Sequence, residues 1–151
     1  MKPQETIDFN IRWAWHSISR MYNTEAAKHS LTMSIGYVLL NIDVEKGTPS
    51  TKLGPKMGME SRSLTRILKS MEEKGFIERK ADENDKRLVR ICLTQEGRKR
   101  QEISKNVVLA FNHTIYKQIP KAKLKTFFEV IGQINSILET DTVFKTNEVA
   151  A

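Results

Sequence analysis

Cysteine is almost missing from this chain of 151 residues, which has a single one, Cys92. One cysteine cannot form an intramolecular disulfide, so we expect a reducing, cytoplasmic location. The first residues do not have the form of a signal peptide, and no apolar run approaches the ~18 residues that a membrane helix needs. The sequence therefore argues against a disulfide-stapled secreted protein and against a membrane protein.

Catalytic and metal-binding signatures are also missing. The three histidines, His16, His29 and His113, lie far apart in the sequence, and no HExxH motif, P-loop or nucleophile elbow is present. No pair of acidic residues has catalytic neighbours. Cys92 is isolated on a predicted strand, so we expect an inert thiol. We expect no enzyme activity, no metal and no cofactor.

Positive charge is abundant, and most of it lies in one third of the chain. The net charge is +7 and the pI is about 9.6. Residues 50–100 contain 14 lysines and arginines against 8 acidic residues, so this segment carries +6 of the total. A basic surface fits a polyanionic partner, although it is equally consistent with a surface that is merely soluble.

Residues 61–74 of this basic segment have the pattern of an amphipathic helix. The apolar positions at helical spacing are Leu64, Ile67, Leu68 and Met71. The positions left outside are Arg62, Thr65, Arg66 and Lys69. A short polar segment at 49–58 precedes this helix, and Gly75 stops it. The two segments together predict a helix-turn-helix.

Two strand-like runs follow, at residues 76–80 and 88–93, with a polar turn between them. In the second run Val89, Ile91 and Leu93 alternate with Arg90 and Cys92, which predicts that the first three face the core. A helix-turn-helix followed by a charged hairpin is the layout of a winged helix, here over residues 48–97. In such a module the second helix enters the major groove of DNA.

Amphipathic helices flank this module. We expect them at residues 6–28, 32–46, 94–119 and 121–139, with Thr6, Thr32 and Thr94 as N-caps. Residues 140–151 are expected to form a loose tail. The surplus apolar faces of residues 5–29 and 98–139 fit pairing with their copies in a second chain; a monomer with a helical cap is the alternative. We predict one mainly α chain over residues 1–151 with a small β-hairpin wing, an α+β fold.

The wing residues resemble those of a known family. Residues 82–87 (Asp-Glu-Asn-Asp-Lys-Arg) and 93–97 (Leu-Thr-Gln-Glu-Gly) are similar to the wing signature of the MarR (multiple antibiotic resistance regulator) family. Its usual form is Asp-Pro-x-Asp-x-Arg followed by Leu-Thr-x-x-Gly. This chain departs from the family pattern with Glu83 where proline is common, and with Gly36 at a helix position often held by glutamine or a similar residue.

The resemblance implies a homodimeric transcription regulator, usually a repressor. Such regulators bind pseudo-palindromic double-stranded DNA and often release it on binding a small phenolic or lipophilic effector. Members that sense oxidants carry their reactive cysteine near the N-terminus, where this chain has none. The alternative is a winged helix used for protein–protein contact without sequence-specific DNA binding. Preference for one duplex over random DNA discriminates between the two.

The expected DNA contacts lie on the second helix and on the wing. On the helix they are Ser61, Arg62, Ser63, Thr65, Arg66 and Lys69. Arg62 or Arg66 could form a bidentate pair with guanine, and either could equally contact phosphate. The resemblance assigns Arg87 to the minor groove and Asp85 to orienting it, with Lys86 between them. The alternative is that Asp85 and Arg87 only hold the turn together.

The resemblance also implies an effector site between the dimerising helices and the winged helix. The aromatic and polar candidates are Trp13, His16, Tyr37 and His113. An apolar pocket with one or two polar tips is what a phenolic acid requires. The alternative is that each of the four is a packing or surface residue.

Overall fold

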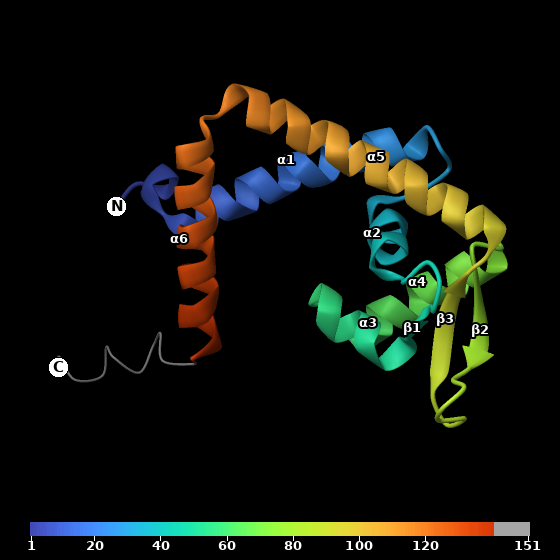
Figure 1. The fold of residues 1–151 in the computed structure, drawn as a ribbon. Helices are drawn as coiled ribbons and strands as arrows, with labels where there is room; N and C mark the ends of the chain where they lie inside the picture. Colours follow the sequence, from blue (N-terminus) through green and yellow to red (C-terminus); the bar gives the residue numbers. More distant parts are fainter. Residues whose placement is uncertain (141–151) are drawn as a thin grey trace. The chain divides into compact units, whose positions relative to one another are not determined.

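The computed structural model describes residues 1–140 (Figure 1). Apart from residue 140, the predicted loose tail of residues 140–151 lies outside the described residues. The chain packs as two units, Met1–Val108 and a second one that begins at Leu109. The helices and strands are η1 (Pro3–Glu5), α1 (Ile7–Ala27), α2 (Met33–Asn41), β1 (Thr48–Pro49), α3 (Ser50–Met57), α4 (Ser61–Glu73), β2 (Ile77–Ala81), β3 (Val89–Leu93), α5 (Gln95–Gln118) and α6 (Lys121–Glu139).

A small antiparallel sheet carries the wing, with the strand order β1-β3-β2. Strands β2 and β3 form a hairpin that extends past α4 (Figure 1), and they pair from Ile77 opposite Leu93 to Ala81 opposite Val89. Strand β1 adds to the other side of β3. The predicted mainly α fold with a hairpin wing is confirmed, and β1 is an addition to it.

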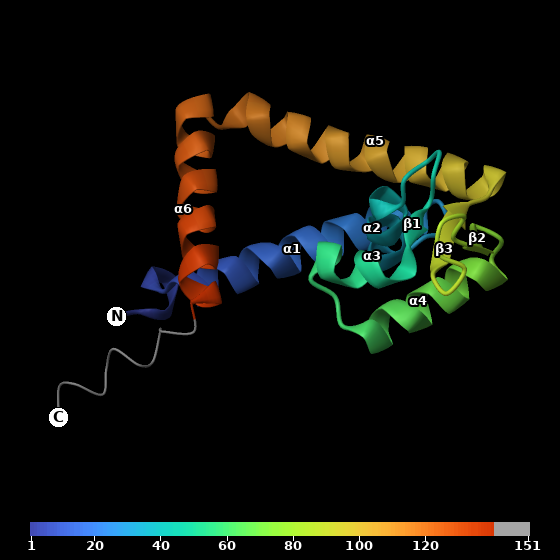
Figure 2. The ribbon, with the colours of Figure 1, turned by 60° about the horizontal axis from the view of Figure 1, so that its bottom comes forward.

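The core of the first unit lies where α2, α3 and α4 meet the sheet. The large side chains that are completely buried there are Leu39, Leu53, Met71, Ile91 and Val38. Leu64 and Leu68 of α4 are also buried, and Ile67 packs against the same core. Burying a side chain of this size contributes roughly 1.5–3 kcal/mol. This core therefore determines which face of α4 is turned outward (Figure 2).

The neck of the wing is closed by Thr94. Its hydroxyl donates to the Gly75 carbonyl at 2.6 Å and accepts the Gly97 N–H at 3.0 Å, so it also caps α5 as predicted. Gly75 adopts φ +71°, the left-handed conformation that ends α4. A side chain is excluded at Gly97, because a Cβ there would lie 1.9 Å from the Phe76 carbonyl oxygen.

The two other predicted N-caps differ from each other. The Thr32 hydroxyl accepts the Ile35 N–H at 3.2 Å, which confirms it as the cap of α2. Thr6 stands at the N-cap position of α1, but its side chain makes no capping bond. Its hydroxyl instead donates to the Pro3 carbonyl at 2.9 Å, because the preceding turn η1 brings that carbonyl within reach.

Helix α2 is shorter than predicted, since it ends at Asn41 and not near residue 46. The Asp43 carboxylate accepts the N–H groups of Glu45 and Lys46 at 2.9 and 2.7 Å, which stabilises a turn in place of further helix. Gln101 of α5 donates to two carbonyl groups at the end of α2, at 2.6 and 2.9 Å. One acceptor, the Leu39 carbonyl, also receives the Ile42 N–H at 3.2 Å, and the other is the carbonyl of the C-cap residue Ile42.

The alternation of β3 is confirmed at two of three positions. Ile91 and Leu93 are buried, whereas Val89 is 38% exposed. Val89 pairs with Ala81 at the far end of the hairpin, beyond the core, so its predicted inward orientation is wrong.

Large apolar side chains remain exposed in each unit. On α1 of the first unit they are Ile7, Ile11, Trp13 and Trp15. On α5 and α6 of the second unit they include Leu109, Tyr116, Phe127, Phe128, Ile137 and Leu138. Large exposed apolar patches on soluble proteins mark interaction sites, so these helices are candidates for a contact surface.

Candidate nucleic-acid interface

The outward face of α4 is polar and basic. The six predicted contact residues Ser61, Arg62, Ser63, Thr65, Arg66 and Lys69 are all exposed. Within residues 1–140 the three cations of this set form no ion pair, whereas Arg79 pairs with Glu72 at 3.2 Å and Lys80 with Glu78 at 2.7 Å on the adjoining strand. Helix α4 therefore offers three cations that no carboxylate of the described chain neutralises.

The first turn of α4 adds to this positive character. It contains no acidic residue. The N–H groups of a first helical turn lack intrahelical acceptors and favour an anion such as phosphate. Ser61 and Ser63 lie in this turn, while the Thr65 hydroxyl donates back to the Ser61 carbonyl at 2.8 Å. A phosphate group could thus be bound at this end of α4 by backbone and hydroxyl donors.

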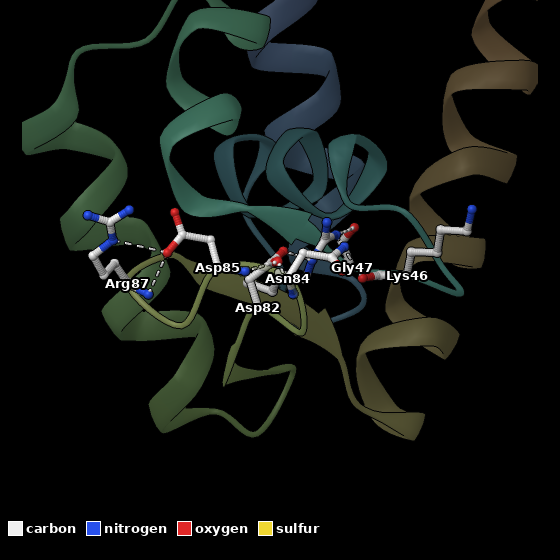
Figure 3. A network of polar contacts seen from close by, with 7 residues as sticks. Lys46, Gly47, Asp82, Asn84, Asp85 and Arg87 are labelled. Carbon is white, nitrogen blue, oxygen red and sulfur yellow. Dashed lines mark hydrogen bonds and ion pairs between the residues drawn. The ribbon is translucent and has the colours of Figure 1, made fainter.

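The wing tip brings together Asp85, Lys86 and Arg87. The Asp85 carboxylate accepts both the backbone N–H and the Nε of Arg87, at 3.0 and 3.2 Å, and Figure 3 shows the two side chains turned toward each other. The Arg87 side chain is 91% exposed. Asp85 therefore sets the direction of a guanidinium whose outer nitrogens remain in solvent.

The wing base contains a buried carboxylate, Asp82, which is only 6% exposed. One of its oxygens accepts the N–H groups of Asn84 and Asp85, at 2.9 and 3.1 Å, and so shapes the wing turn (Figure 3). The other oxygen pairs with the Nε of Arg90 at 2.5 Å. The two N–H groups, and after them the guanidinium, hold the pKa of Asp82 below its usual value.

Arg90 links this carboxylate to another part of the chain. Its Nη1 donates to the carbonyl groups of Lys46 and Gly47, at 3.1 Å each, in the loop that leads into β1. In the sequence pattern Arg90 has an outward position, and no role follows from that position. The one available signal was the pair of opposite charges, Asp82 and Arg90, at the two ends of the predicted turn.

A cavity of about 600 Å³ lies in the first unit, among α1, α2, α5 and the turn between α3 and α4. Its walls are mostly aromatic and aliphatic, and they include Trp15, Tyr22, Met33, Tyr37, Met59 and Val107. Burial raises the pKa of the Tyr22 hydroxyl. A volume of this size suits a small organic ligand.

The structure distributes the predicted effector residues over different places. Tyr37 lines the cavity, whereas Trp13 and His16 line a separate open hollow along α1, together with Arg20. His113 belongs to the second unit. Trp15 and Tyr22 were not among the predicted effector residues, although their spacing of seven residues places them on one helical face.

Among residues 1–140, no three His, Cys, Asp or Glu side chains come together in a way that could hold a metal ion. No helix within those residues is both long and apolar enough to span a bilayer. Cys92 is half-buried on β3, where it pairs across the sheet with Glu78.

Comparison with known sequences identifies relatives. Residues 31–89 match the model of the MarR family. The chain is 36% identical over 90 residues to the HTH-type transcriptional regulator TtmR of Methylorubrum extorquens (strain PA1), an alignment that covers 60% of this chain and 46% of the relative. With SarZ of Staphylococcus haemolyticus the alignment covers 53% of this chain and 54% of the relative, at 31% identity. The chain thus spans about half the length of these two relatives. With SarZ of Staphylococcus saprophyticus it is 32% identical over 115 residues, which cover 73% of this chain and 79% of that one.

Solved structures share the fold. The MepR–DNA complex of S. aureus superposes with a TM-score of 0.80 at 18% identity, covering 87% of this chain and 97% of that one. CouR from Rhodococcus jostii RHA1, bound to p-coumaroyl-CoA, gives a TM-score of 0.77 at 20% identity, covering 89% and 94%. The family model falls on the winged helix with the free basic face, and the S. saprophyticus SarZ match covers more than two thirds of that relative. This chain belongs to the MarR family.

Proposed function

We propose that this protein is a homodimeric transcription regulator that binds a specific DNA duplex through α4 and the wing, and that represses transcription until a small ligand releases it. The observation that carries the proposal is the outward face of α4, where Arg62, Arg66 and Lys69 are exposed and unpaired within residues 1–140. Membership of the MarR family supports it.

DNA binding would divide between the two basic elements. Helix α4 enters the major groove, where a bidentate arginine–guanine pair is worth ~1–3 kcal/mol of discrimination. Arg62 and Arg66 are the residues able to form it. The wing places Arg87 in the neighbouring minor groove, whose negative potential attracts a guanidinium when the groove is narrow. MepR, which has the same fold, forms a complex with DNA, and this supports DNA as the partner.

A second copy of the chain would cover the exposed apolar side chains of α1, α5 and α6. A two-fold dimer buries the same patch from both chains, and it presents two α4 helices to one duplex. Two recognition helices related in this way address half-sites about 10 base pairs apart, centre to centre. A pseudo-palindromic operator follows from that symmetry.

Release would start at the cavity. Its wall includes Met57, Gly58 and Met59, the turn that leads directly into α4. A small aromatic or lipophilic ligand that contacts this turn would favour conformations in which α4 has a different position. The population of the DNA-binding conformation would then decrease. CouR, which shares the fold and is bound to p-coumaroyl-CoA, supports a ligand-controlled regulator.

Selection from random-sequence duplexes tests the proposal. We expect an enriched, pseudo-palindromic duplex that binds about a thousandfold or more tighter than a shuffled duplex at the same salt concentration. Sedimentation of the free protein should give the mass of two chains. Arg66→Ala should weaken binding strongly, and Lys105→Ala, on the exposed surface of α5, serves as its control. Equal binding of the two duplexes would favour the protein–protein alternative.

A further inference from the structure

We propose that the cavity of the first unit selects an uncharged ligand and discriminates against organic anions, including the carboxylates that a phenolic-acid effector would present. This inference concerns the ligand class of the proposed regulator and so rests on the proposed function. It depends on which side chains line the cavity and on which nearby cation is unavailable to a ligand.

As residues 1–140 form it, the cavity wall contains no lysine, arginine, aspartate or glutamate. Its surface comes from α1 (Trp15, Tyr22), α2 (Met33, Tyr37) and α5 (Ile103, Val107), together with methionines of the α3–α4 turn. An anion that enters such a site loses water and meets no lysine or arginine there, which is costly. An uncharged molecule with the same rings loses far less.

One candidate for a counter-charge is Arg100, which lies in the same helix as Ile103 and Ser104 and already has other partners. Its Nε pairs with Glu96 at 2.7 Å, and its Nη1 donates to the His29 carbonyl at 2.7 Å. The guanidinium also lies 5.6 Å from the centre of the Phe76 ring. Arg100 therefore holds the α1–α2 connection and is not directed at a ligand.

The polar groups in the wall are suited to hydrogen bonds and not to charge pairing. The hydroxyls of Thr32 and Ser104 already bond to backbone groups, at 3.2 and 2.9 Å. Ser34, Tyr37 and His29 are further polar residues of the wall. A neutral carbonyl or amide matches such donors. The methionine side chains add an adaptable apolar surface.

The other hollow is chemically different, because Arg20 lines it beside Trp13 and His16. A carboxylate added to the protein could therefore bind there. The chain offers a way to tell the two places apart, since it has only two tryptophans, Trp13 in the hollow and Trp15 in the cavity. Trp13→Phe leaves a reporter of the cavity, and Trp15→Phe leaves a reporter of the hollow.

The test is a fluorescence titration of the full chain with 2-naphthamide and 2-naphthoate, which share their rings and differ in charge. In the Trp13→Phe variant we expect the amide to quench Trp15 at a concentration at least tenfold lower than the naphthoate. The Trp15→Phe variant should show no such preference for the amide. Equal or tighter binding of naphthoate at Trp15, or no quenching by either compound, would overturn the proposal.

A designed cation provides the second arm. Tyr37 is 46% exposed, so the wall tolerates replacement there. In the Trp13→Phe background, Tyr37→Arg should reverse the preference toward naphthoate, while Tyr37→Phe should keep the preference for the amide. If Tyr37→Arg, shown to be folded by circular dichroism, left the preference unchanged, the charge argument would be wrong. Neither arm uses DNA, so their failure is distinct from a failure of the proposed DNA binding.

Discussion

Arg90 and Asp82 form an ion pair across the base of the wing, with 2.5 Å between Nε and the carboxylate oxygen. Because the same guanidinium donates to the carbonyl groups of Lys46 and Gly47, it ties the wing turn to the loop before β1. The wing is thereby attached to the helical body through side-chain bonds as well as through the sheet.

We predict that Arg90→Ala weakens DNA binding although Arg90 is not directed at DNA. The variant leaves a buried carboxylate without its cation and two carbonyl groups without a donor, so the wing loses its fixed position. Affinity for the selected duplex should fall roughly tenfold, which is the order of magnitude expected when a contact that positions the wing is lost. The melting temperature of the protein should fall by several degrees.

Arg98→Ala is the control for this prediction, because Arg98 forms a surface ion pair with Glu45 at 3.4 Å and should contribute little. Arg90→Lys should restore only part of the effect, since an ammonium lacks the fork that reaches three acceptors. Unchanged DNA affinity of Arg90→Ala would show that the wing does not need this anchor.

The lowered pKa of Asp82 predicts that its contribution to the stability of the protein is lost at acid pH. Its folded pKa lies below the ordinary value of 3.8. Its stabilising contribution is therefore complete above that value and is lost as the pH falls through the folded pKa. The difference in unfolding free energy between the wild type and Asp82→Asn should be constant from pH 7 to pH 5 and should shrink below about pH 4.

Urea unfolding at several pH values measures this difference. Asp43 also has a lowered pKa, from the N–H groups of Lys46 and Glu45, and it remains in both proteins. The comparison therefore isolates Asp82. A difference that grew as the pH fell would contradict the assignment.

At the wing tip, Asp85→Ala and Arg87→Ala should affect DNA binding to different extents. Arg87→Ala removes a cation, so affinity should fall and the slope of log affinity against log salt should decrease by about 1. Asp85→Ala removes only the group that orients Arg87, so a smaller loss is expected with no decrease of the slope. Both residues are on the surface, and stability should change by less than about 0.5 kcal/mol.

Anisotropy titrations at four salt concentrations give both quantities. Lys86→Ala, in the same turn, shows how much any cation at this place contributes. A larger loss for Asp85→Ala than for Arg87→Ala would indicate that the carboxylate only stabilises the turn.

Ser30→Gly should stabilise the protein. Ser30 has φ +56°, which is unfavourable for a residue with a side chain. It occupies the position after α1 where glycine is favoured, with the Leu31 N–H bonded back to the Ala26 carbonyl. We expect a gain of roughly 0.5–1 kcal/mol in urea unfolding, after allowing for the greater freedom of glycine in the unfolded chain.

The matched control is Ser17→Gly, inside α1, which should lose about 1 kcal/mol instead. If the two changes had the same sign, the conformation assigned to Ser30 would be doubtful.

Elements with strong local patterns were predictable from the sequence. Leu64, Leu68 and Met71 marked the inner face of α4 because a helical stripe depends only on spacing. Gly75 and Thr94 marked helix ends because their chemistry acts on neighbouring residues. The pairing of Asp85 with Arg87, two positions apart, was instead implied by the resemblance to the MarR family.

Features that depend on distant parts of the chain were not predictable. Strand β1 has two residues, too few for any alternation, and it exists because β3 lies beside it. Arg90 appeared to be an outward residue, because its acceptors Lys46 and Gly47 precede it by more than forty residues. On α1 apolar residues occupy more than one face, so the pattern did not indicate whether Trp13 or Trp15 lines the cavity.

Because the neck of the wing is closed at Thr94, the length of the wing can change without a change in the positions of α4 and α5. The bond from its hydroxyl to the Gly75 carbonyl joins residues 19 positions apart and encloses the whole hairpin. Insertions or deletions at the tip of the hairpin would change how far the wing extends without altering its junction with the two helices. Evolution or a designer could therefore exchange the tip to suit a different flanking sequence while keeping the bases read by α4.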